Sequence, residues 1–125
     1  MKEIEIGGHK YSIRKLPLIQ QFHISRKLTP YIVAGSNIDF NLSIMAALAR
    51  LPDSDSEYVV DACMAVTQIK QETQWSNIGS LRAPMFEFIA PLDYYDITAE
   101  VIEGCLANFF TGLLSKIAGS KTSEA

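Results

Sequence analysis

The side chains best suited to bind a metal ion in this chain are two histidines and two cysteines: His9, His23, Cys63 and Cys105. Structural zinc sites usually begin with two ligands only a few residues apart. None of these four residues has another of them that close along the chain. The sequence therefore predicts no metal site.

A run of carboxylates, Asp53, Asp55 and Glu57, is spaced like the first ligands of a calcium-binding loop. Such a loop needs glycine at its sixth position and a bidentate glutamate at its twelfth. This chain has Tyr58 and Met64 at those positions. Helix capping explains the run better, because carboxylates are favourable near the positive end of a helix dipole.

The chain also lacks the short motifs of common enzymes, such as a Gly-x-Ser-x-Gly elbow, a phosphate-binding glycine loop with lysine, or His-Glu-x-x-His. Asp93 and Asp96 would be candidates for an acid and base pair, but their spacing fits the first turn of a helix. We predict no catalytic residue, no cofactor and a protein that is not an enzyme.

The charge of the chain is unevenly distributed. The net charge of −3 argues against a general nucleic-acid binder. However, residues 1–27 contain six Lys or Arg and two Glu, so they carry a local charge of +4 and leave −7 for the rest. An acidic partner, or the acidic part of a second copy, would suit this region. A small nucleic-acid-associated regulatory protein that uses this basic region is the alternative function.

With 125 residues, 48% of them hydrophobic, the chain has the size of one globular domain. Two cysteines are too few for a disulfide framework and favour a reducing compartment. The first four residues, Met1 to Ile4, do not begin an apolar signal segment. The apolar stretch from Val101 to Ala118 is interrupted and shorter than a membrane-spanning helix. We expect a cytoplasmic protein without membrane contact.

The N-terminal residues 2–14 have the pattern of a β-hairpin. Apolar and polar residues alternate on both sides of the turn Gly7–Gly8. The apolar ones, Ile4, Ile6, Tyr11 and Ile13, should share one face. A hairpin is marginally stable alone, so this face should pack on helices or on another chain.

Helical patterns follow in the region 17–118. The first helix, from Pro17 to about Leu28, should bury Leu18, Phe22, Ser25 and Leu28. Thr29 should cap a short helical segment that begins at Pro30, and the range 35–37 should form a loop.

Two further helices should begin at acidic or hydroxyl residues. Asp39 is the expected N-cap of the second helix. Ser54 and Glu57 should form a capping box on the third, which should end near Lys70 or Glu72.

The range 72–91 is the least regular, and we expect partial helical structure there. The last helix should begin at Asp93 or Asp96 and end at Gly119, and residues 119–125 should form a disordered tail. The prediction is a single domain over residues 1–118 with an α+β fold, mainly α-helical, in which one hairpin precedes about four to five helices.

The last helix is apolar on most of its circumference. Its large apolar residues occupy more than one stripe: Val101, Ile102, Leu106, Phe109, Phe110, Leu113, Leu114 and Ile117. Such a helix either lies centrally in a core or contributes to the surface that binds a partner. Both interpretations stay open on the sequence alone.

In order and spacing, several segments resemble the tail assembly chaperone proteins of tailed bacteriophages and prophages. These are the hairpin from Ile4 to Tyr11, the entry Lys15–Pro17, and the segment from Gln21 to Pro30. They also include Leu48–Asp53 with Glu57, then Trp75, then Val101–Gly104 with Phe109 and Phe110. The resemblance covers the chain up to about Ile117.

The resemblance implies a non-enzymatic chaperone in the cytoplasm of the bacterial host. Such proteins bind the long, aggregation-prone tape measure protein and help tail tube subunits assemble around it, and some families also produce a longer frameshifted form. We expect the partner surface to combine exposed apolar residues of the last helix with the hairpin. The candidate partner-binding residues are Phe109, Phe110, Leu113, Tyr11, Arg14 and Arg26. The charge split also predicts some self-association.

Overall fold

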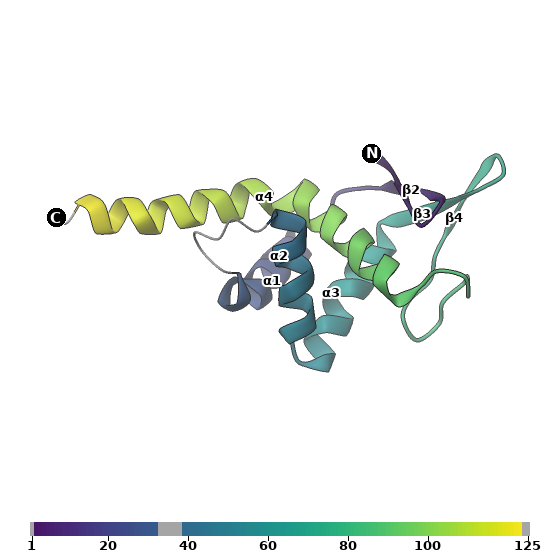
Figure 1. The fold of residues 1–125 in the computed structure, drawn as a ribbon, viewed down its shortest axis with the longest axis horizontal. Coiled ribbons are helices and arrows are strands. Elements are labelled where there is room, and N and C mark those ends of the chain that lie inside the picture. The colour runs from purple at the N-terminus through teal and green to yellow at the C-terminus, as the bar shows by residue number, and fades with distance from the viewer. Residues whose placement is uncertain (1, 33–38, 124–125) are drawn as a thin grey trace.

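The computed structural model describes residues 2–32 and 39–123, and the side chains of all of these except Leu114 and residues 117–123. The strands are β1 (Lys2–Ile6), β2 (His9–Ile13), β3 (Thr67–Gln71) and β4 (Gln74–Asn77). The helices are α1 (Leu18–Leu28), the 3₁₀ helix η1 (Thr29–Tyr31), α2 (Phe40–Arg50), α3 (Asp53–Ala65) and α4 (Pro91–Ser123). The mainly helical α+β fold with an N-terminal hairpin is confirmed (Figure 1).

The strands form one antiparallel sheet in the order β1-β2-β3-β4. Gly7 and Gly8 make the turn of the first hairpin at φ of 59° and 82°, a region that glycine enters without steric cost. Ile4 lies opposite Tyr11, and Tyr11 and Ile13 are buried. The predicted apolar face of the hairpin is therefore confirmed.

The second hairpin corrects a prediction. The third helix ends at Ala65 instead of near Lys70 or Glu72, and β3 and β4 follow it. The range 72–91, expected to be partly helical, contains β4 and a loop with a bridge between Gly79 and Pro84. The reason lies in tertiary structure, because β3 pairs with β2 and thereby satisfies backbone groups that the first hairpin leaves open.

The helix starts are partly as predicted. Asp39 caps α2, since its carboxylate accepts a hydrogen bond from the amide of Asn41 at 3.1 Å. The capping box of Ser54 and Glu57 is wrong, because α3 starts after Pro52 and has no side-chain cap.

The short helical segment after α1 is confirmed as η1, but Thr29 is not its cap. The Thr29 hydroxyl instead donates a hydrogen bond to the carbonyl of Ser25 at 2.6 Å. The predicted loop at 35–37 lies outside the described residues.

Helix α4 is longer than expected. It begins at Pro91, ahead of Asp93 and Asp96, and continues to Ser123, so both predicted starts and the predicted end at Gly119 are wrong. Proline suits the first position of a helix because its missing N–H would have no partner there. The division into a domain over 1–118 and a tail stays a prediction.

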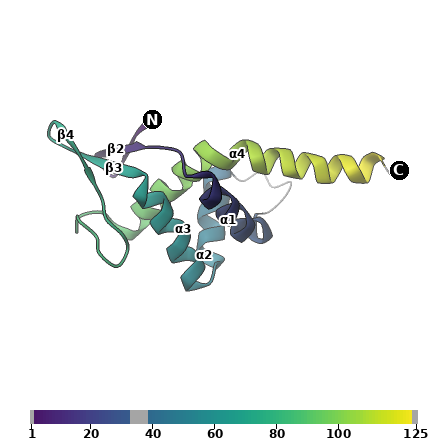
Figure 2. The same cartoon turned by 180° about the vertical axis from the view of Figure 1, so that it is seen from behind.

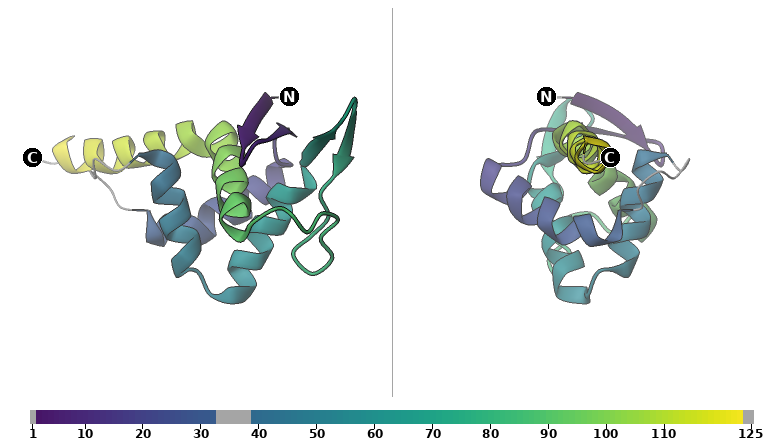
Figure 3. Two further views of the ribbon diagram at one scale, coloured as in Figure 1. Left: turned by 45° about the vertical axis from the view of Figure 1, so that its right-hand side comes forward. Right: turned by 90° about the vertical axis from the view of Figure 1, so that its left-hand side faces the viewer.

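The first part of α4 lies at the centre of the molecule. It packs against α2 and α3, and it meets α1 and β1 as well. Large side chains with almost no exposure fill the core: Tyr11, Ile24, Leu28, Ile44, Leu48, Met64, Ile69, Ile78, Ile97 and Ile102. Figure 2 shows the same arrangement from behind, and Figure 3 shows that α4 bends before its last part projects away from the body. None of the described helices combines the length and apolar character needed to cross a membrane.

Replacing Gly79 with alanine should lower the free energy of unfolding by about 2 kcal/mol. Gly79 has φ of +88°, and an added Cβ would collide with the carbonyl oxygen of Ala83 and lie 2.9 Å from the amide nitrogen of Met85. Urea denaturation followed by circular dichroism measures the loss. Gly8→Ala is the control, because its φ is similar but no atom lies within 4 Å. If both variants lost the same free energy of unfolding, the close contacts with Ala83 and Met85 would not be the cause.

Candidate protein-binding groove between α1 and α4

The segment that leads into α1 is tied to α4 through Leu16, which is buried. The Leu16 N–H donates to Sγ of Cys105 at 3.3 Å, and the Leu16 carbonyl accepts from Nε2 of Gln21 at 2.7 Å. These two bonds satisfy the backbone of a residue that leaves the sheet, and they hold the start of α1 beside the middle of α4.

Helix α1 faces the core with Ile24, Ser25 and Leu28. Leu18 and Phe22, expected on the buried side, are instead 69% and 59% exposed. The sequence carries a signal for this, because the apolar residues of α1 form two stripes and the core accommodates only one. Leu18 and Phe22 are one helical turn apart, and exposed apolar side chains that adjoin one another are a feature of binding surfaces.

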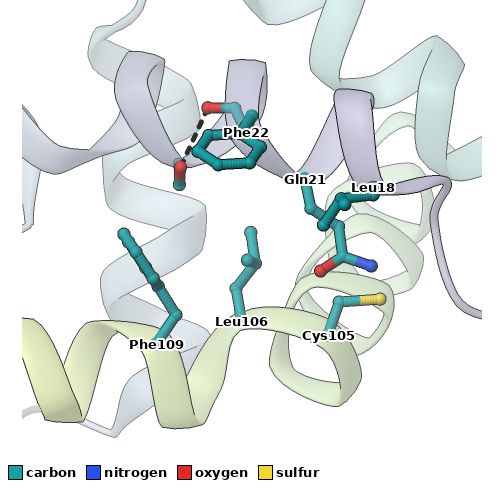
Figure 4. Close-up of a pocket in the computed structure, with 7 residues that line it drawn as sticks. Leu18, Gln21, Phe22, Cys105, Leu106 and Phe109 are labelled. Atoms are coloured by element: carbon teal, nitrogen blue, oxygen red, sulfur yellow. Dashed lines mark hydrogen bonds between the residues drawn. The ribbon is translucent and has the colours of Figure 1, made fainter.

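These side chains form one wall of a groove whose other wall is α4 (Figure 4). The groove has a volume of about 150 Å³. Its lining residues are Leu18, Gln21, Phe22 and Ser25 from α1 and Cys105, Leu106 and Phe109 from α4. The Ser25 hydroxyl donates to the carbonyl of Phe22 at 2.9 Å, so this polar group already has a partner. The groove is therefore suited to an apolar side chain of another protein.

The predicted residues of the last helix divide between groove and core. Phe109 is 45% exposed and lines the groove, and Leu113, one turn further on, is half-buried. Phe110 is buried, with its ring centroid 6.1 Å from that of Phe40 and 5.4 Å from that of Phe109. The helix therefore serves both the core and a surface, the two interpretations that its sequence leaves open.

The predicted residues of the N-terminal region divide in the same way. Arg14 and Arg26 are exposed: Arg14 lines a hollow that shares Cys105 with the groove, and Arg26 directly follows the groove residue Ser25. Tyr11 is buried in the core, and its hydroxyl has no hydrogen-bond partner among the described residues. Burial and the nearby carboxylate of Asp93 raise the pKa of Tyr11 to about 12. Tyr11 lies near Asp93 and Tyr94 at the start of α4, and neither Tyr11 nor Phe110 is among the side chains that line the groove.

The side chains best suited to bind a metal ion are not gathered into one site in the part of the chain that the structure describes. In residues 2–32 and 39–123, no three His, Cys, Asp or Glu side chains lie close enough together to hold a metal ion. Cys63 is fully buried, which raises the pKa of its thiol and keeps it protonated. His23 lies on the outer side of α1, where Nδ1 is 3.1 Å from the hydroxyl of Tyr58.

Replacing Tyr11 with phenylalanine should leave the free energy of unfolding unchanged or raise it by up to about 1 kcal/mol, because a buried hydroxyl without a partner is removed.

The wild-type protein should lose stability as the pH rises from 10 towards 12, since the raised pKa of Tyr11 favours the folded state only while the phenol is protonated. Denaturation at several pH values checks both effects. If the Tyr11→Phe variant were much less stable than the wild type at neutral pH, the Tyr11 hydroxyl would have to have a hydrogen-bond partner.

Comparison with known proteins identifies the family of the chain. Residues 7–115 match the family described as "Phage tail assembly chaperone protein, TAC". No curated protein and no solved structure matches the chain. The matched range is most of the chain and includes every residue that lines the groove. The chain belongs to the phage tail assembly chaperone family.

Proposed function

We propose that this tail assembly chaperone binds the tape measure protein, and that the groove between α1 and α4 is where it does so. The observation that carries the proposal is the exposure of Leu18, Phe22 and Phe109 around a single apolar groove. A chaperone for an elongated, aggregation-prone client needs an apolar surface that the client can cover. The tail tube protein is a second client that the family role allows.

The energetics suit reversible binding. Complete burial of one large apolar side chain contributes about 2 kcal/mol, so two or three such side chains supply several kcal/mol. The loss of translational and rotational freedom on association offsets much of this gain. A client held by these side chains alone would therefore bind weakly and be released readily.

The proposed role involves surface complementarity and requires no catalysis. We place it in the cytoplasm of the bacterial host, where phage proteins are synthesised and where the free cysteines Cys63 and Cys105 would remain reduced.

The test is co-expression of the chain with the tape measure protein encoded nearby. The wild-type chain should keep that protein soluble and co-purify with it. A double variant, Leu18→Glu with Phe22→Glu, should lose most of the soluble complex, because each carboxylate would have to be desolvated in the groove. Both side chains are already largely exposed, so the variant should fold normally, as circular dichroism would show.

Leu42→Glu is the matched control, because Leu42 lies on α2 outside the groove and is 56% exposed. It should keep the complex. Loss of the complex in this control but not in the double variant would place the binding surface elsewhere. A wild-type chain that keeps no tape measure protein soluble would overturn the proposed function as a whole.

A further inference from the structure

The walls of the groove come from two segments that lack acidic residues entirely. Neither residues 14–31 nor residues 104–116 contain Asp or Glu, although the whole chain has a net charge of −3. The same segments contain Arg14, Lys15, Arg26, Lys27 and Lys116. Cations therefore outnumber carboxylates around the groove in a protein that is acidic overall, and the nearest carboxylate on α4 is Glu103, two residues before Cys105.

Two of these cations lie at the end of the groove where α1 begins. Arg14 and Lys15 line a hollow of about 190 Å³ together with Gly104 and Cys105 of α4. Cys105 also lines the groove, so the hollow and the groove are adjacent. Both basic side chains are exposed, and neither has an ion pair within the described part of the chain.

The opposite end of the groove is also basic. Arg26 follows Phe22 by one helical turn, so the two side chains are neighbours on one face of α1. Arg26 is exposed and forms no ion pair with any residue described, whereas the neighbouring Lys27 binds Asp55 at 2.7 Å. On α4, Lys116 follows Phe109 by two turns and is exposed too.

We infer that the ligand of this groove is an amphipathic helix whose apolar residues are flanked at both ends by Asp or Glu. This inference rests on the proposed function, because it specifies which kind of client segment the groove accepts. A helix presents apolar side chains at a spacing of three and four residues, which matches a groove between two helices. Carboxylates at its ends would meet the unpaired cations, which favours the encounter and sets the register.

A second copy of the chain is a poorer occupant. Its most acidic helical segment is the start of α3, from Asp53 to Glu57. Asp55 in that segment pairs with Lys27, and Glu57 pairs with Arg82, so these carboxylates already have partners. The cations at the ends of the groove therefore suit another protein better than a second copy.

The experiment uses the full chain and two fluorescently labelled synthetic peptides of ~18 residues, about five helical turns. Both carry the same apolar stripe, one with Glu at its ends and the other with Lys. Fluorescence anisotropy should show the Glu peptide binding roughly fivefold or more tightly at low salt, and high salt should remove most of this difference. The double variant Arg14→Glu with Arg26→Glu should reverse the preference. Lys10→Glu, an exposed change on β2 outside the groove, should leave it unchanged.

Equal binding of both peptides by the wild type, or no binding of either, would overturn this inference. The proposed function would still hold after such a result if the complex with the tape measure protein depended on Leu18 and Phe22. Tight binding of duplex DNA that the charge reversal abolishes, without peptide binding, would also overturn it and favour a nucleic-acid partner. Self-association of the chain that Phe22→Glu abolishes, with no binding of either peptide, would overturn the inference as well.

Discussion

The first part of α4 is the element on which the rest of the structure depends. It carries the buried side chains Ile97, Val101 and Ile102, and α4 packs against α2 and α3 and meets β1 of the hairpin as well. A domain of 125 residues has a limited interior, so a helix at its centre is in contact with most of the other elements. As a result α1, α2, α3 and the sheet are arranged around α4, and the last part of α4 projects beyond them (Figure 3).

The groove follows from this arrangement. α1 meets α4 where the backbone of Leu16 is bonded to Cys105, and only the stripe with Ile24 and Leu28 reaches the core. The other apolar stripe of α1, with Phe22, is left facing α4 at the surface. A surface made by two segments far apart in the sequence exists only in the folded protein, so the binding site and the stability of the core are coupled.

The sequence predicts the local features of this protein better than its long-range ones. The first hairpin and the cap at Asp39 are encoded by residues next to one another, and both are confirmed. The second hairpin carries no such signal, because its turn at Glu72 and Thr73 has no glycine, and its pairing with β2 joins residues more than fifty positions apart. Phe109 was expected at the surface and lies there, but burial of Tyr11 and Phe110 and exposure of Phe22 depend on packing that periodicity alone does not settle.

The central claim is that partners bind in the groove between α1 and α4, and site-specific photo-crosslinking tests it most directly. A photoreactive phenylalanine analogue replaces either Phe22, in the groove and 59% exposed, or Phe88, 50% exposed and outside it. In the complex with the tape measure protein, the account predicts strong crosslinking from position 22 and little from position 88. Crosslinks from position 88 and none from position 22 would contradict it.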